Sequence, residues 1–211
     1  MIGVVIPTRG DRSDFLERCL MMLDRQTLKA DETCIISESP KSEDKDITYR
    51  YRKGFEKLFA KGCTVVFMIE DDDWYSPEYI ETMYTHWINS ESPDVFGIGE
   101  TTYYHLGRNT YSRMIHPNRS SAFSTMVSKA VLDIDFPDDN YPFLDLELWK
   151  QLKGKTFIPD ENICLGIKHG VGVCGGRGHD DDFKYDNQDK DFHYLKKIVG
   201  PSWKYYKNLL I

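Results

Sequence analysis

The sequence lacks the features that mark several broad classes of protein. No apolar run approaches the ~18 residues that a membrane-spanning helix needs. The apolar run near the N-terminus is too short for a signal peptide and has no basic residues before it. The five cysteines are widely spaced and form no CxxC pair, which argues against a disulfide framework and a cysteine zinc site. We therefore expect a cytoplasmic protein.

Basic charge is also scarce. The 211 residues carry 27 Lys and Arg against 34 Asp and Glu, a formal net charge of −7. General nucleic-acid binders usually carry a basic stripe, so nucleic acid is a less favoured partner. Several basic residues of the second half can still contact phosphates, although ordinary surface charge is the simpler explanation for them: Arg108, Arg113, Arg119 and Lys129.

Hydrophobic periodicity predicts an α/β fold. Hydrophobic residues make up 40% of the chain, enough for a packed core. Over residues 1–90, apolar strands alternate with segments of helical spacing, as in a parallel sheet flanked by helices. Residues 94–116 predict a hairpin around Gly107. The sequence contains no repeat, linker or low-complexity segment, so we expect a single domain over 1–211, with halves 1–100 and 101–211.

The segment "VVFMIEDDDWYSPEYIE" places four acidic residues, 70–73, at the end of an apolar strand. Like charges repel one another and resist desolvation, so a positive partner is expected there. Carboxylates at a strand end suit Mg²⁺ or Mn²⁺. On an extended chain Glu70 and Asp72 share one face, and Asp71 and Asp73 the other. A solvated turn with helix-capping acids is the alternative, but it accounts for one or two acids better than for four.

The same segment resembles the DxD region of family 2 glycosyltransferases, which have the GT-A fold. "VVIPTRGDRSDFLERCLMMLDRQTL" is similar to that family's first strand, turn and helix, and "FLDLELWKQL" and "IKHG" resemble later segments. The resemblance implies a Rossmann-like, mostly parallel sheet flanked by helices, with a small antiparallel acceptor-side portion. It also implies a metal-dependent, inverting glycosyltransferase that moves a sugar from a nucleotide-diphosphate donor, expected to be a UDP-sugar, to a hydroxyl of a glycan, or less favourably of a protein or a modified nucleic-acid base.

The resemblance assigns the metal ligands and the donor contacts by position. Asp72 is the main ligand of Mn²⁺ or Mg²⁺, and Asp71 and Asp73 are alternative ligands if the register differs by one residue. His169 and His179 compete for a later ligand position. The residues expected to bind the nucleotide-sugar are Pro7, Thr8, Arg9, Glu38, Arg52, Glu70, Asp71 and, in a glycine-rich segment, Arg177.

Transfer with inversion needs a general base for the acceptor hydroxyl. Asp145 takes the position of the family's base, with Glu147 as its substitute. These two residues lie ~200° apart on a helix of ~100° per residue, so only one can face the pocket squarely. The alternative is that both are first-turn carboxylates favoured by the helix dipole.

Three other functions stay open at this point. A nucleotidyltransferase would share the acidic metal site but normally has a glycine-rich loop after its first strand, where "PTRGDR" has one glycine. A noncatalytic nucleotide- or sugar-binding module is kept open by Leu144, which stands where the family usually has an acid. A carboxylate-clustered nuclease is disfavoured by the acidic net charge.

Overall fold

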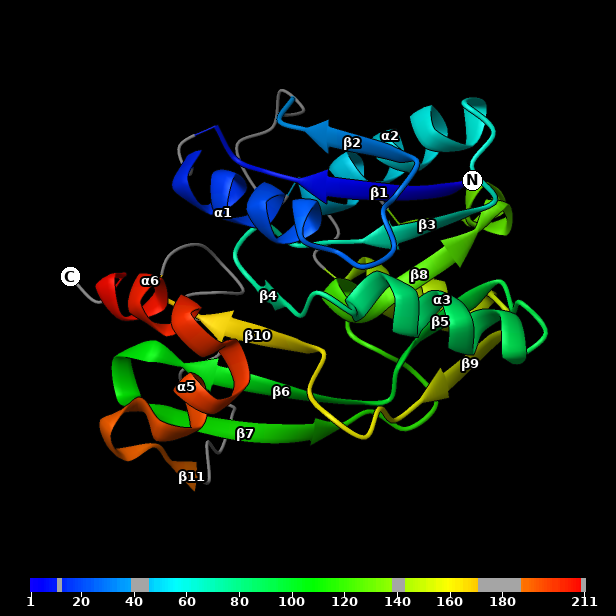
Figure 1. Ribbon diagram of the computed structural model, residues 1–211. Helices are drawn as coiled ribbons and strands as arrows, with labels where there is room; N and C mark the ends of the chain where they lie inside the picture. Colours follow the sequence, from blue (N-terminus) through cyan, green and yellow to red (C-terminus); the bar gives the residue numbers. More distant parts are fainter. Residues whose placement is uncertain (11–12, 39–45, 138–142, 171–186, 210–211) are drawn as a thin grey trace.

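The computed structural model describes residues 1–10, 13–38, 46–137, 143–170 and 187–209. Within these ranges the strands form two sheets; in Figure 1 the six-stranded sheet runs from the top to the lower right, and most of the five-stranded sheet lies at the lower left. In spatial order, the six-stranded sheet contains β2 (Glu32–Ile36), β1 (Ile2–Pro7), β3 (Val65–Met68), β8 (Thr125–Ser128), β5 (Val95–Ile98) and β9 (Gly154–Phe157). The five-stranded sheet contains β11 (Asn187–Gln188), β7 (Thr110–Ile115), β6 (Glu100–His105), β10 (Cys164–Lys168) and β4 (Trp74–Tyr75).

The first three strands of the chain are parallel, as their alternation with helices predicts. β1 lies between β2 and β3 and pairs in parallel with both. The crossovers contain α1 (Ser13–Asp24) and α2 (Ile47–Ala60), and α3 (Tyr79–Asn89) follows. β8 then runs antiparallel to β3 and β5, and β9 runs parallel to β5. The prediction of an α/β fold with a mostly parallel sheet is confirmed.

The second sheet is mostly antiparallel, which confirms the smaller antiparallel portion. β6 and β7 form the hairpin expected around Gly107. Asn109 closes its turn with φ 49°, a left-handed conformation that asparagine tolerates. β10 pairs in parallel with β6 and antiparallel with β4, so it joins the hairpin to the chain segment that follows β3.

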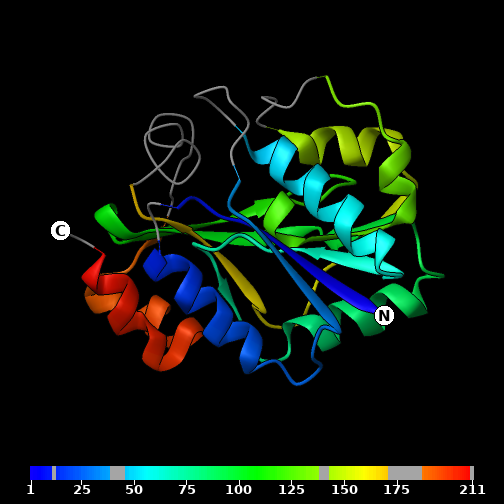
Figure 2. The same cartoon turned by 90° about the horizontal axis from the view of Figure 1, so that it is seen from above.

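Helices cover both faces of the structure. Figure 2 shows α1, α3, α5 (His193–Val199) and α6 (Trp203–Asn208) on one side, and α2 and α4 (Leu144–Gln151) on the other. Two buried hydrophobic clusters match these sides, since Val4 packs with α1 and α3 whereas its neighbour Val5 packs with α2 and α4. Among the described helices, none has both the length and the apolar character needed to cross a bilayer.

Two later segments add to the sheets and to the core. Residues 156–170 contribute the end of β9 to one sheet and all of β10 to the other. The C-terminal segment buries Leu195, Val199 and Tyr206 in the core. α5 and α6 have seven and six residues, too few to show a clear helical period in the sequence.

Gly54 marks the closest approach of α2 to the first sheet. A Cβ at this position would overlap Cγ2 of Val5 and come within 3.1 Å of its Cβ. Alanine normally stabilises a helix interior by about 1 kcal/mol relative to glycine, but here the stiff Val5 side chain must move. We expect Gly54→Ala to destabilise the protein by about 1–3 kcal/mol in chemical denaturation. Gly10→Ala, with nothing within 4 Å of the added methyl, is the control, and an equal effect of both changes would contradict the close packing.

Candidate active site

The acidic residues after β3 lie on a turn. The Asp73 amide donates to the Glu70 carbonyl over 3.4 Å, so the chain does not stay extended beyond the strand. Carboxylate oxygens of Glu70, Asp72 and Asp73 consequently lie within 4.8 Å of one another. Asp71 points elsewhere and accepts a hydrogen bond of 2.5 Å from the Thr8 hydroxyl at the end of β1. The expected pairing of Glu70 with Asp72 agrees with this geometry, whereas the pairing of Asp71 with Asp73 is wrong because the turn breaks the strand alternation.

The turn is held from several sides. The Glu70 amide donates to the Tyr75 hydroxyl over 3.0 Å, and that hydroxyl donates to the Phe123 carbonyl over 3.2 Å. The Tyr206 hydroxyl of α6 donates to the Asp73 carbonyl over 3.3 Å. Segments far apart in the chain therefore fix the backbone that carries the carboxylates.

The ends of β1 and β2 meet beside this turn. The amide of Thr8, the residue after Pro7, donates to the Ile36 carbonyl over 3.0 Å. The buried Arg50 guanidinium donates to the carbonyl oxygens of Thr8 and Ile36, and it pairs with Asp46 at 2.6 Å. Parallel sheets bind ligands at this edge, the carboxyl ends of their strands.

The remaining residues expected on the donor side occupy more peripheral positions. Arg9 is exposed after β1. Glu38 is exposed and pairs with Lys57 of α2 at 3.5 Å, and the Arg52 guanidinium lies 5.8 Å from the centre of the Phe136 ring. Arg177 and His179 lie outside the described residues. Arg52 is the arginine expected at the donor site, but it is Arg50 of α2 whose guanidinium donates to carbonyl oxygens at the strand ends.

β10 brings two basic side chains to the acidic cluster. His169 Nε2 lies 2.9 Å from Asp72 Oδ2, and the His169 ring packs 4.7 Å from Phe15 of α1. The Ile167 amide donates to Asp73 Oδ1 over 2.7 Å. Lys168 is buried, and its ammonium lies 4.8 Å from the centre of the Tyr103 ring. Lys168 is not among the site residues expected from the sequence.

Burial and mutual repulsion dominate the electrostatics of the cluster. Burial, followed by the charge of Asp72, raises the pKa of Glu70 to about 7. Burial also raises the pKa of Asp73, and the charges of Asp72 and Glu70 add to this effect. Lys168 opposes both increases without cancelling them. The site therefore holds more negative charge than its nearby lysine compensates.

The donor set fits a hard divalent cation. Glu70, Asp72 and Asp73 each offer a carboxylate oxygen, the ligand atom that Mg²⁺ and Mn²⁺ prefer. The hydroxyl of the fully buried Tyr51 has no hydrogen-bond partner within the described ranges. After burial, Glu70 contributes most to raising the Tyr51 pKa, which places this hydroxyl in the electrostatic environment of the cluster. An orphaned buried donor there suits a ligand oxygen.

The two candidate bases differ in their surroundings. Asp145 Oδ2 lies 3.2 Å from Arg119 Nη1. Burial raises the pKa of Asp145 and Arg119 opposes this rise, while the Asp145 charge itself helps to raise the pKa of Glu70. Glu147 instead accepts hydrogen bonds from Gln151 and Lys150 of its own helix, at 3.0 and 3.5 Å. Asp145 is thus the candidate that shares the environment of the acidic cluster.

Comparison with solved structures places this geometry in a known fold. Crystal structures of S. aureus TarS match the chain. TarS 1–349 in complex with UDP-GlcNAc matches with a TM-score of 0.56 and 11% identity, over 79% of this chain and 58% of that chain. TarS matches with a TM-score of 0.54 and 11% identity, over 82% of this chain and 37% of that chain, and TarS 1–349 in complex with UDP matches with a TM-score of 0.52 and 13% identity, over 82% and 61%. The chain has the GT-A fold. It spans between 37% and 61% of the lengths of these TarS structures. No protein-family model and no curated protein matches the sequence.

The raised pKa of Glu70 predicts a pH-dependent stability. In the metal-free GT-A fold Glu70 holds its proton up to about pH 7, whereas its ordinary pKa is 4.5. Because Glu70 has a higher pKa in the folded protein than in the unfolded chain, ionisation of Glu70 favours the unfolded chain. The free energy of unfolding therefore falls as pH rises from about 4.5 to about 7. Glu70→Gln removes this loss. In EDTA, the Tm of Glu70→Gln minus that of wild type should therefore increase between about pH 5 and about pH 7.

The matched control for this measurement is Glu56→Gln, an exposed glutamate of α2. Its Tm difference from wild type should be the same at both ends of that pH range. A difference for Glu70→Gln that stays constant with pH would show that this carboxyl titrates normally.

Proposed function

We propose that the chain is a metal-dependent glycosyltransferase that moves a sugar, with inversion, from a UDP-sugar to a hydroxyl of a glycan. The observation that carries this proposal is the convergence of Glu70, Asp72 and Asp73 at the carboxyl end of a GT-A sheet, beside Lys168 and His169. TarS, crystallised with UDP-GlcNAc, supports the fold-level part of the proposal.

Glu70, Asp72 and Asp73 would hold Mn²⁺ or Mg²⁺ together with the donor diphosphate. When bound, the cation supplies positive charge that offsets the negative charge developing on the departing diphosphate. His169, at 2.9 Å from Asp72, orients that carboxylate or joins the ligand set. Lys168 adds a buried positive charge on the same side.

Asp145 would act as the general base. The acceptor oxygen attacks the anomeric carbon, the bond between this carbon and the diphosphate oxygen breaks, and the hydroxyl proton passes to the Asp145 carboxylate. The base must be ionised before this step. Arg119 favours that state, because its positive charge lowers the pKa that burial raises.

A noncatalytic donor-binding module is the second candidate. Two observations favour it: Leu144 stands where the family usually has an acid, and Asp145 is already paired with Arg119. Donor binding is expected under both candidates, whereas transfer of the sugar is expected only under the first.

The donor site predicts metal-dependent ligand binding. In a thermal-shift screen of UDP, GDP, CMP and ADP, UDP with Mn²⁺ should raise the wild-type Tm by about 5–10 °C at about 100 times its Kd. The shift should disappear without metal and in Asp72→Ala. It should persist in the control Asp133→Ala, which changes an exposed aspartate outside the cluster. UDP binding that is unchanged by removal of the metal and by Asp72→Ala would contradict the donor-site assignment.

If Asp145 is the general base, its substitution should lower the rate of the reaction without weakening UDP binding. Release of UDP from the cognate UDP-sugar, with water as acceptor, should slow by about 10²–10⁴ in Asp145→Asn and change little in Glu147→Gln. Metal-dependent UDP binding should stay intact in both variants. In Arg119→Gln the loss of the positive charge raises the Asp145 pKa, so the acid limb of the rate profile should move to higher pH.

These outcomes separate the two candidate functions. A wild-type protein that binds UDP with metal but releases no UDP from any UDP-sugar tested is the noncatalytic module. A large rate loss in Glu147→Gln with none in Asp145→Asn would reverse the assignment of the base.

A further inference from the structure

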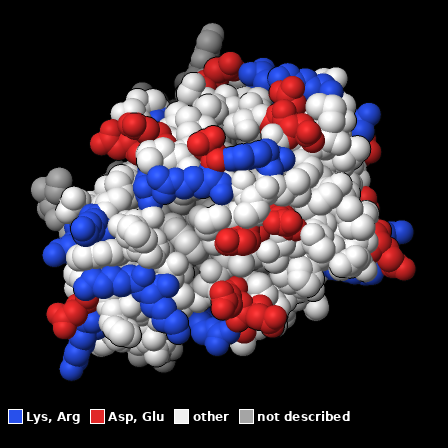
Figure 3. All heavy atoms as spheres, viewed as in Figure 1, with Lys and Arg blue, Asp and Glu red and all other residues white. Residues whose placement is uncertain are grey.

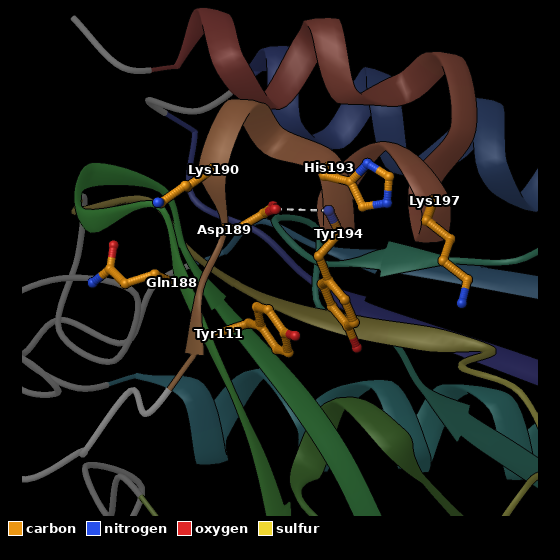
Figure 4. Close-up of a pocket in the computed structure, with 7 residues that line it drawn as sticks. All are labelled: Tyr111, Gln188, Asp189, Lys190, His193, Tyr194 and Lys197. Atoms are coloured by element: carbon orange, nitrogen blue, oxygen red, sulfur yellow. Dashed lines mark hydrogen bonds between the residues drawn. The ribbon is translucent and has the colours of Figure 1, made fainter.

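A pocket lies away from the acidic cluster, at the outer edge of the five-stranded sheet. It has a volume of about 420 Å³ and is formed by β7, β11 and the start of α5 (Figure 4). This volume falls within the range of small-ligand sites. Its lining residues are Tyr111, Gln188, Asp189, Lys190, His193, Tyr194 and Lys197.

The floor of the pocket is a rigid aromatic platform. The rings of Tyr111 and Tyr194 stack at 3.6 Å with an angle of 3° between their planes. The Tyr194 amide donates to Asp189 over 2.7 Å, and its hydroxyl accepts from Asn162 over 3.0 Å. Because Tyr194 is fixed at both ends, a ligand on this platform orders few protein groups, which lowers the cost of binding.

The charge around the platform is positive. Lys190 and Lys197 are exposed and have no ion-pair partner among the residues that the structure describes. They lie on opposite sides of the tyrosine pair, with His193 on the helix above it (Figure 4). Lys and Arg side chains also dominate this part of the surface, over α5 and α6 at the lower left of Figure 3.

One acidic residue, Asp189, also lines the pocket, but its carboxylate is held by hydrogen bonds within the protein. Asp189 is buried, and its carboxylate accepts three hydrogen bonds: from the Tyr194 amide, from the Leu195 amide over 3.0 Å and from the Tyr104 hydroxyl over 2.9 Å. Its role is to fix the start of α5. An incoming anion therefore meets the lysines and the polar edge of Gln188.

We propose that this pocket binds an anionic saccharide, one that carries phosphate or carboxylate groups. The partly exposed rings of the two tyrosines suit the C–H faces of sugar rings, and a lysine on each side suits separated negative charges. A nucleic acid fits less well, because the tyrosines stack on each other without space for a base between them and the net charge of the chain is −7.

The sheet links this pocket to the acidic cluster. Lys168 of β10 pairs with His105 of β6, His105 pairs with Thr110 of β7, and Thr110 pairs with Gln188 of β11. Three strand spacings of roughly 4.8 Å put the backbones of Lys168 and Gln188 roughly 14 Å apart along the sheet. The saccharide would then be a distal part of the sugar acceptor. This assignment rests on the proposed transferase function, whereas binding of the saccharide to the pocket does not.

The test is calorimetric titration of the whole chain with defined probes, without nucleotide. The probes are trigalacturonate for carboxylates, glucose 1,6-bisphosphate for phosphates, neutral maltotriose and a short oligothymidylate. We expect one of the two anionic sugars to bind, with affinity that falls as salt increases. Lys190→Ala/Lys197→Ala should weaken this binding at least about tenfold, because charge-assisted contacts are lost.

The control is Lys29→Ala/Lys153→Ala, which makes the same charge change at exposed lysines outside the pocket and should leave affinity unchanged. Tyr111→Leu should weaken binding through loss of the platform. Equal loss in both double variants, maltotriose binding as tightly as the anions, stronger binding of the oligothymidylate, or no anionic binding would overturn the proposal. Metal-dependent UDP binding by Lys190→Ala/Lys197→Ala, measured in parallel, reports the donor site separately.

Discussion

The repulsion among the carboxylates at the end of β3 is the constraint on which the site depends. Left to itself, a turn carrying four acids would spread its side chains into water. Here three hydrogen bonds prevent this: Asp71 accepts from Thr8, Asp73 from the Ile167 amide, and Asp72 contacts His169. These contacts come from β1 and from the end of β10. The fold thus holds negative charge in place that the nearby lysine does not fully offset.

β10 connects the acidic turn to the second sheet. It pairs with β4, which directly follows the acidic turn, and with β6 of the hairpin that carries the second sheet. The charge of its last residue, Lys168, opposes the rise of the Glu70 pKa, and the next residue, His169, contacts Asp72. The pocket beside β11 belongs to the same sheet and so has a fixed relation to the cluster.

Much of the fold could be predicted from the sequence because its signals are local. The apolar runs of β1 and β3, the helical spacing of α1 and the hairpin around Gly107 each depend on neighbouring residues. The convergence of strand ends then followed from the topology of parallel sheets.

The finer placement of the site depends on contacts that local patterns do not encode. The direction of Asp73 depends on a turn, and the partnership of Arg119 with Asp145 spans 26 positions. Tyr51 and Arg50 become site residues only when α2 docks on the sheet. The central claim, that the cluster of Glu70, Asp72 and Asp73 is a cation site, is tested most directly by anomalous diffraction at the manganese edge, on crystals soaked with Mn²⁺ and UDP. A single strong peak among these carboxylates, next to His169, is the predicted result. An ordered UDP with no manganese at the cluster, or manganese bound only elsewhere, would contradict the account.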